Sequence, residues 1–184
     1  MIITGRYSHK GGEEFINKNH SRELLEVEKA INGIDATTVF SKKNGDSQRK
    51  FDTLYSPIEM NEQISKTLSD FNWTKHPRIN FEGRQYREMD AIKNKVGLEI
   101  QFGKYSFMSY DIFSKMPIFA NHGLIECGIE VVVMSSMAKK MSNGVSSFSH
   151  IKTDMKERGV ADIDIPTLIL GFEMNVSTLI EWGT

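Results

Sequence analysis

MDAIKNKVGLEIQFG, residues 89–103, is the stretch that decides the fold of this chain. From Val96 to Phe102, apolar residues alternate with polar or small ones, which is typical of a β-strand with one buried face. The Asn-Lys pair at positions 94 and 95 suits a tight turn, because asparagine tolerates left-handed backbone geometry. The stretch therefore predicts a β-hairpin with one strand over 87–92 and the other over 96–102.

The two strands of this hairpin carry acidic residues in register. A two-residue turn pairs Ala91 with Leu98 and places Asp90 opposite Glu99, where Cβ atoms lie about 4.5–5.5 Å apart. Carboxylates this close repel unless a cation lies between them, and a hard divalent cation with oxygen ligands is the usual one. Gln101 lies on the same face as Glu99. The pattern predicts a Mg²⁺ site suited to phosphodiester hydrolysis, and an ordinary solvated hairpin face is the alternative interpretation.

Helices and further strands flank the hairpin. Continuous β-branched runs at Gly128–Met134 and Thr167–Phe172 are typical of central strands covered on both faces. Residue patterns predict three helices, over Glu13–Ile31 with Ser21 as a possible cap for a second segment, from Pro57 to about Ser69 with Ile58, Ile64 and Leu68 inward, and over Phe107–Phe119 with Pro117 bending or ending it. Strands interleaved with helices predict a layered α/β domain.

Length and composition indicate the class of protein. The 184 residues suit a single compact domain over 1–184, and 39% hydrophobic with 26% charged residues is typical of a globular chain. The single Cys127 excludes an internal disulfide, and the region after Met1 lacks the layout of a signal peptide, so a cytoplasmic protein is expected. No apolar run approaches the roughly 20 residues that cross a bilayer, so no membrane role is expected.

The net charge limits the kinds of DNA interaction. A formal net charge of −1 argues against a basic protein that coats DNA, because such proteins gain affinity by releasing phosphate counterions. An average near zero is nevertheless compatible with a basic groove around an acidic centre. The basic segment Ser41–Lys50 either clamps DNA or is a solvated surface loop, and both interpretations remain open.

A known family shares the order of residues at the hairpin. Asp90, eight intervening residues and then Glu99-Ile100-Gln101 resemble the PD-(D/E)XK nuclease signature, with Gln101 where most members have lysine. The stretch LEIQFGKYSFMSYDIF, Leu98–Phe113, resembles the BglII and BstYI group of restriction endonucleases, in which glutamine likewise replaces the lysine. Further similarity, closest to the BstYI branch, lies in YSH at 7–9, IDA at 34–36, LYSP at 54–57, GIEVVVM at 128–134 and MSNGVSSF at 141–148.

This resemblance implies both a fold and an activity. The fold would be the restriction-endonuclease-like three-layer α/β fold, with a central mixed β-sheet flanked by helices. The activity would be that of a type II site-specific deoxyribonuclease, which uses Mg²⁺ to cut double-stranded DNA at a short palindrome with a GATC centre and leaves 5′ overhangs. Because a palindrome has two-fold symmetry, the enzyme would act as a homodimer. Its interface would use the helix over 107–119 or the first helix.

The resemblance also assigns roles to residues of the hairpin. Asp90 and Glu99 would be the metal-binding acids, the carbonyl of Ile100 would also face the metal, and Gln101 would help to position the attacking water. A glutamine cannot act as a general base or carry a positive charge, so proton removal would fall to the metal, a substrate phosphate or bulk water. Glu26 matches an acidic position in the group, and we expect it to be structural.

Two polar segments would contact the DNA bases. They comprise Lys104, Tyr105 and Ser106 after the catalytic strand, and Ser142, Asn143, Ser146 and Ser147 after the next central strand. The residue types suit the major groove, because lysine can donate to guanine or phosphate, asparagine can pair with adenine, and serine is small and adaptable. The alternative interpretation of the second segment is an ordinary polar turn.

Two other functions remain possible from the sequence. The chain could be another PD-(D/E)XK nuclease, for repair or for a DNA structure, which would need neither a palindrome nor a dimer. It could also be a non-catalytic DNA-binding domain, which the absent lysine favours and the intact Asp90 and Glu99 oppose. The sequence alone leaves open the recognition site with its flanking bases, the number of metal ions and a companion methyltransferase.

Overall fold

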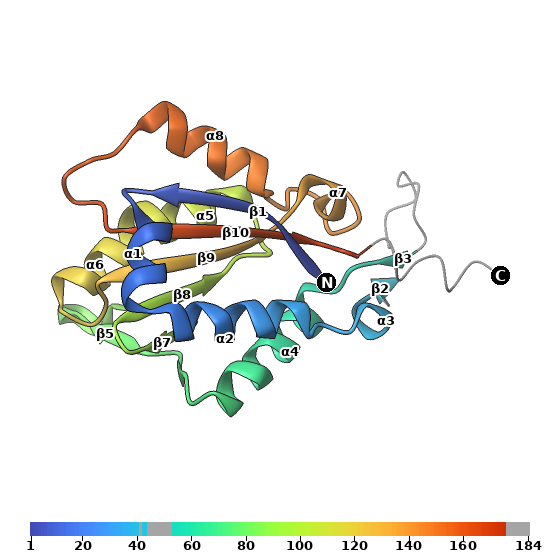
Figure 1. The fold of residues 1–184 in the computed structure, drawn as a ribbon, viewed down its shortest axis with the longest axis horizontal. Coiled ribbons are helices and arrows are strands. Elements are labelled where there is room, and N and C mark those ends of the chain that lie inside the picture. Colours follow the sequence, from blue (N-terminus) through green and yellow to red (C-terminus); the bar gives the residue numbers. More distant parts are fainter. Residues whose placement is uncertain (41, 44–52, 176–184) are drawn as a thin grey trace.

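A six-stranded mixed sheet lies at the centre of the computed structural model, which describes residues 1–40, 42–43 and 53–175 (Figure 1). Its strands follow the order β1 (Ile2–His9), β10 (Thr167–Glu173), β9 (Cys127–Val133), β8 (Val96–Ile100), β7 (Ala91–Lys93) and β4 (Thr74–Lys75). The three central strands are parallel to one another, whereas β1, β7 and β4 run antiparallel to their neighbours. The predicted mixed sheet is confirmed.

Helices cover both faces of this sheet, so the fold has the three layers that were predicted (Figure 1). One layer contains α1 (Gly12–Asn19), α2 (Ser21–Asn32) and α4 (Pro57–Asp70), and the other contains α5 (Tyr105–Tyr110), the π-helical segment η2 (Asp111–Lys115), α6 (Met116–Asn121) and α8 (Phe148–Arg158). Alternate residues of β9 enter opposite cores: Val131 packs in the first and Val132 in the second. The two cores explain why β9 and β10 are apolar along nearly their whole length.

The remaining elements are short. They are α3 (Ala36–Val39), β2 (Lys42–Lys43), β3 (Thr53–Leu54), β5 (Arg78–Asn80), η1 (Glu82–Arg84), β6 (Tyr86–Glu88) and α7 (Ser135–Ala138). Apart from β2, which pairs with β3, the basic segment predicted over Ser41–Lys50 lies outside the described residues. Within the described part of the chain, no helix is long and apolar enough to cross a bilayer.

Several predicted elements differ in their bounds. The first helix is divided at His20, and Ser21 is the first residue of α2 rather than its cap. The predicted strand over 87–92 is two strands, because β6 leaves the central sheet to pair with β5, and only β7 pairs with β8. In α4, Ile64 and Leu68 are buried as predicted, but Ile58 is 68% exposed. Ile58 is the second residue of α4, and its side chain faces solvent there.

Pro117 does not end the third predicted helix. Residues 105–121 remain helical, and the π-helical segment η2 directly precedes α6 with Pro117 in its first turn. Since proline has no N–H to donate, the helix lacks one hydrogen bond at this point, and the wider turn lies where that bond is missing. The widened turn also sets the direction of the two charged residues at its ends, Asp111 and Lys115.

The structure shows that Glu26 is part of a buried network. Its carboxylate accepts hydrogen bonds from Lys93 Nζ at 2.7 and 2.8 Å and from Trp73 Nε1 at 2.9 Å, and Lys93 Nζ also donates to Phe71 O at 2.7 Å. Burial acts to raise the pKa of Glu26, but the bonds from Lys93 and Trp73, with a further bond from Arg22 Nε to Oε1 at 3.1 Å, outweigh it and leave the pKa below its ordinary value. The network joins α2 to β7 and supports a structural role for Glu26.

Replacing Glu26 should therefore destabilise the fold. In Glu26→Gln, the ammonium of Lys93 stays buried without a carboxylate partner, and we expect the free energy of unfolding to fall by about 3–5 kcal/mol. Urea denaturation would measure the loss. The double variant Glu26→Leu/Lys93→Met should lose less unfolding free energy than the sum of the losses in Glu26→Leu and in Lys93→Met, because it removes both charges of the pair. If the loss in the double variant equals the sum of the two single losses, the energetic coupling of Glu26 and Lys93 is contradicted.

Candidate active site

The predicted hairpin is present, and its register is confirmed for three pairs, whereas the predicted pairing of Asp90 with Glu99 lies beyond the end of the ladder. Ala91 pairs with Leu98, Ile92 with Gly97 and Lys93 with Val96. The turn residues Asn94 and Lys95 both have positive φ, at 47° and 68°.

Asp90 lies one residue beyond the end of this ladder. Its carboxylate reaches across to β8, where Asp90 Oδ2 accepts a hydrogen bond from the backbone N of Ile100 at 2.7 Å. The backbone N of His76 donates to Asp90 O at 3.1 Å, so the residue is held from both sides. The carboxylate is thus fixed beside the carboxyl end of β8, where Glu99 and Ile100 lie.

Four carboxyl groups gather here, and we call Asp90, Glu99, Asp111 and Glu130 the acidic cluster. Glu99 on β8 is paired in the sheet with Glu130 on β9. The ammonium of Lys115 lies 2.9 Å from Glu99 Oε1 and 2.6 Å from Asp111 Oδ1. Both oxygens of Glu130 are buried without a hydrogen-bond partner among the described residues. In the described part of the chain, the site thus brings four carboxyl groups together with the single ammonium of Lys115.

The environment changes the protonation of the cluster. Burial raises the pKa of Glu99 to about 9, the charges of Asp90 and Asp111 add to the rise, and Lys115 opposes it. Burial also raises the pKa of Asp90, against the hydrogen bond from Ile100. For Lys115, burial acts to lower the pKa, but Glu99 and Asp111 outweigh it and raise the pKa above its ordinary value. Carboxyls with such raised pKa values favour a site that gains a cation.

The donor set suits a hard divalent cation. Among the described residues, no group of three His, Cys, Asp or Glu side chains is arranged to hold a metal ion. Mg²⁺, however, is usually bound by one or two carboxylates and keeps several waters. Asp90 and Glu99 supply two carboxyl groups of this kind, and the excess of carboxyl groups over ammonium groups in the cluster supports the fit. That the Ile100 carbonyl also faces the metal stays a prediction. The residues present therefore fit Mg²⁺.

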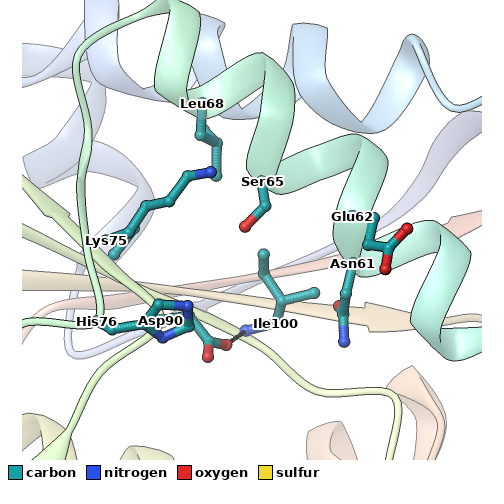
Figure 2. A pocket seen from close by; sticks show the side chains of 9 residues that line it. Asn61, Glu62, Ser65, Leu68, Lys75, His76, Asp90 and Ile100 are labelled. Atoms are coloured by element: carbon teal, nitrogen blue, oxygen red, sulfur yellow. Dashed lines mark hydrogen bonds between the residues drawn. The ribbon is translucent and has the colours of Figure 1, made fainter.

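A pocket of about 250 Å³ opens beside Asp90 and Ile100, and Glu99 is not among the residues that line it (Figure 2). Residues of α4 line one side, and the segment before β7 lines the other; the lining residues are Asn61, Glu62, Ser65, Leu68, Lys75, His76, Asp90, Ala91 and Ile100. Figure 2 shows the Asp90 carboxylate bonded to the Ile100 nitrogen at the floor of this space.

Gln101 is held at both ends of its carboxamide. Its Nε2 donates to Asp111 Oδ2 at 2.9 Å, and its Oε1 accepts from the backbone N of Gly103 at 2.8 Å. These two bonds define the orientation of the amide, because exchanging its oxygen and nitrogen would break both. Gln101 therefore enters the site as a fixed neutral group next to the acidic cluster.

The two polar segments predicted to contact DNA are brought together. Lys104 forms an antiparallel bridge with Val145, and the backbone N of Ser146 donates to Gly103 O at 3.2 Å. The members differ in exposure: Lys104, Tyr105, Ser106 and Asn143 are exposed, Ser142 is half-buried, and Ser146 and Ser147 are buried. The two segments thus lie side by side, and only some of their side chains are exposed. Their role in DNA binding stays a prediction.

Sequence reasoning missed several residues of the site. Glu130 had a signal, since it is a lone acid within the apolar run GIEVVVM. Asp111 and Lys115 had a weaker one, because their spacing of four places them on one face of a helix. The pocket residues of α4, such as Glu62 and Ser65, had none, because their approach to Asp90 depends on how α4 packs on the sheet.

The fully buried Glu130 gives a pH-dependent prediction. Burial raises its pKa well above the ordinary value, so the folded protein holds a proton that the unfolded chain releases from about pH 4.5 upward. Stability from this group is therefore present at low pH and is lost as the pH rises toward the raised pKa. In EDTA, Glu130→Gln should be more stable than the wild type at pH 8, and the difference should shrink at pH 5. Melting curves at both pH values would test this, and an equal difference at both would contradict it.

Comparisons with known proteins relate this architecture to one group. The family model described as "Restriction endonuclease BglII/BglIII" matches residues 5–172. Among solved structures, the fold is similar to restriction endonuclease BglII complexed with a DNA 16-mer, with a TM-score of 0.79 and 14% identity over 95% of this chain and 79% of that chain. It is also similar to free BglII, with a TM-score of 0.66 and 16% identity over 95% of this chain and 81% of that chain. No curated protein matches the chain.

Proposed function

The chain belongs to the BglII/BglIII family of restriction endonucleases, and from this membership we propose how it cleaves DNA. It is a type II restriction endodeoxyribonuclease. We propose that it uses Mg²⁺ to hydrolyse both strands of a short palindrome with a GATC centre, leaving 5′ overhangs. The observation that carries this proposal is the acidic cluster at the end of β8, of which Asp90 also lines the pocket.

The hairpin residues would prepare the scissile phosphate. Asp90, Glu99 and the Ile100 carbonyl would hold Mg²⁺, which when bound stabilises charge on the phosphate and lowers the pKa of a water. Gln101, whose amide is fixed by Asp111 and Gly103, would orient the attacking water. Because an amide cannot accept the proton, the proton would leave to a substrate phosphate or to solvent. We also propose, from the order of Asp90, Glu99 and Gln101 in the sequence, that the chain belongs to the PD-(D/E)XK superfamily. Its length suggests one compact domain, and its sequence resemblance suggests BstYI as a close relative.

The surface formed by the two polar segments would read the DNA. Lys104, Ser106 and Asn143 are exposed and can reach base edges or phosphates. Tyr105 is held in place, because its hydroxyl donates to Asp154 on α8 and its ring packs edge-on against His150 at 5.7 Å. The partly buried Ser142 and the buried Ser146 and Ser147 would maintain the loop that presents Asn143. Similar structures include BglII complexed with DNA, which supports double-stranded DNA as the partner.

A homodimer would match the two-fold symmetry of a palindrome. Both surfaces considered for its interface carry an exposed apolar residue. Phe107 on α5 is 54% exposed, and Leu25 on α2 is 49% exposed. Either residue could become buried between two copies of the chain.

Digestion of a defined plasmid with purified protein and Mg²⁺ tests the proposed function. The expected result is a discrete set of fragments whose sequenced ends carry 5′ overhangs at sites with a GATC centre, and no cleavage in EDTA or with Asp90→Ala or Glu99→Ala. Discrete ends with another central sequence would refute the GATC assignment but keep the nuclease. Ragged or structure-dependent ends would favour a different PD-(D/E)XK nuclease. Binding to DNA without cleavage under several metals would favour a non-catalytic domain.

A further inference from the structure

Lys115 is the cation that pairs with the acidic cluster in the described part of the chain. Its ammonium contacts Glu99 Oε1 at 2.9 Å and Asp111 Oδ1 at 2.6 Å, and its side chain is 14% exposed. The lysine belongs to the segment η2, whereas Glu99 belongs to the strand β8, sixteen positions earlier in the sequence. Lys115 belongs neither to the proposed metal ligands nor to the residues proposed to contact the DNA bases.

The catalytic strand itself has no positive charge to offer. The strand was predicted over 96–102 but ends at Ile100; these seven residues read VGLEIQF, without lysine or arginine, and Gln101 contributes only a neutral amide. Yet Glu99 and Asp111 are buried, with 3% and 2% exposure, and buried carboxylates require a cation or several donors. The compensating charge must therefore come from another element, and the contacts show that it comes from Lys115.

The contacts of Lys115 extend to Gln101 through Asp111. One oxygen of the Asp111 carboxylate bonds Lys115 Nζ, and the other accepts from Gln101 Nε2 at 2.9 Å. Contacts thus run from Glu99 on β8 through Lys115 and Asp111 to Gln101, which directly follows the end of β8. The wider π-helical turn places Asp111 and Lys115 on one side of the helix, and such turns are frequent at functional sites.

We propose that Lys115 is a positioning residue of the cleavage site, which holds Glu99 directly and Gln101 through Asp111. Most PD-(D/E)XK members have a lysine at the position of Gln101, and Lys115 would supply that positive charge from the helical segment instead. This inference rests on the proposed function, because the two groups that Lys115 positions are a proposed metal ligand and the proposed water-orienting amide. Removing the ammonium would let both groups move away from the scissile phosphate, and small displacements of this kind cost about 10²-fold in rate.

The test compares Lys115→Met with a matched control, Lys93→Met. Lys93 is also a buried lysine, at 12% exposure, and it pairs with Glu26 rather than with the acidic cluster. Both variants should lower the Tm in EDTA, by about 6–15 °C, because each removes the buried ammonium that pairs with a buried carboxylate. Below both Tm values, Lys115→Met should lower kcat for DNA cleavage about 10²-fold with little change in KM. Lys93→Met should keep the wild-type kcat.

The reciprocal variant Gln101→Lys/Lys115→Gln decides between positioning and simple stability. It moves the charge onto the strand, where Asp111 can accept from a lysine as it now accepts from Gln101. Recovery of at least about tenfold in kcat over Lys115→Gln, together with recovery of Tm in EDTA, would support the inference, even if Lys115→Met does not fold. A wild-type kcat in Lys115→Met, or no recovery in the reciprocal variant, would overturn it while the nuclease stands. A wild type that cleaves no DNA would instead refute the proposed function.

Discussion

Asp90→Asn and Glu99→Gln are each expected to lower kcat for DNA cleavage by about 10³-fold or more. Each change keeps the shape of the side chain but removes one of the two carboxylates that are proposed to bind the metal. Metal-ion catalysis contributes several kcal/mol to transition-state stabilisation, and each 1.36 kcal/mol corresponds to about tenfold in rate. Asn can still accept the hydrogen bond from the backbone N of Ile100 at position 90, so the end of β8 should stay in place.

The stability of Asp90→Asn should change in the opposite direction from its activity. Burial raises the pKa of Asp90, and the charge of Asp111 adds to the rise, so the charged form is costly in the absence of metal. In EDTA at pH 8, where the unfolded carboxyl is ionised, Asp90→Asn should melt at the same temperature as the wild type or higher. This combination separates loss of a metal ligand from loss of folding.

Single-turnover cleavage and melting curves on the same samples would measure both effects. The matched control is Glu126→Gln, since Glu126 lies at the opposite ends of β8 and β9 and its carboxylate pairs with His20 at 2.7 Å. This control should cleave at the wild-type rate. Cleavage by Asp90→Asn at more than about a tenth of the wild-type rate would exclude Asp90 as an essential ligand.

Gly12→Ala should destabilise the fold more than any other change of one methyl group considered for this protein. A Cβ at position 12 would lie 2.3 Å from the carbonyl C and O of Thr167 and 2.4 Å from its N. These are backbone atoms of the central strand β10, so no side chain can rotate away. Either α1 must shift or β10 must bend. We expect the free energy of unfolding to fall by about 3 kcal/mol or more.

Urea denaturation of Gly12→Ala beside Gly11→Ala would test this packing argument. A Cβ at position 11 would meet no atom within 4 Å, but Gly11 has a φ of +69°. Alanine there should therefore cost only the strain of a left-handed residue, about 1–2 kcal/mol. A larger loss for Gly11→Ala than for Gly12→Ala would contradict the close approach of α1 to β10.

Local patterns predicted the parts of the fold that depend on neighbours in sequence. The alternation from Val96 onward and the Asn94-Lys95 turn predicted the register of the hairpin, which the pairing of Ala91 with Leu98 confirms. The continuous apolar runs predicted β9 and β10, because a strand covered on both faces is apolar along its length. In contrast, β1 was missed, because IITGRYSH has no clear alternation and the strand lies at the edge of the sheet.

The sequence by itself determined the hairpin, the central strands and the order of acids that brings Asp90 to the end of β8, because turns and strand periodicity act over a few residues. Only the tertiary structure decided that Lys115 and Asp111 reach Glu99 and Gln101, that Glu130 is buried beside Glu99, and that the loops at 103–106 and 142–147 meet. These contacts depend on the packing of helices against the sheet and on the order of its parallel strands. Such long-range arrangements leave no period in the local sequence, since they are set by burial of apolar surface over the whole chain.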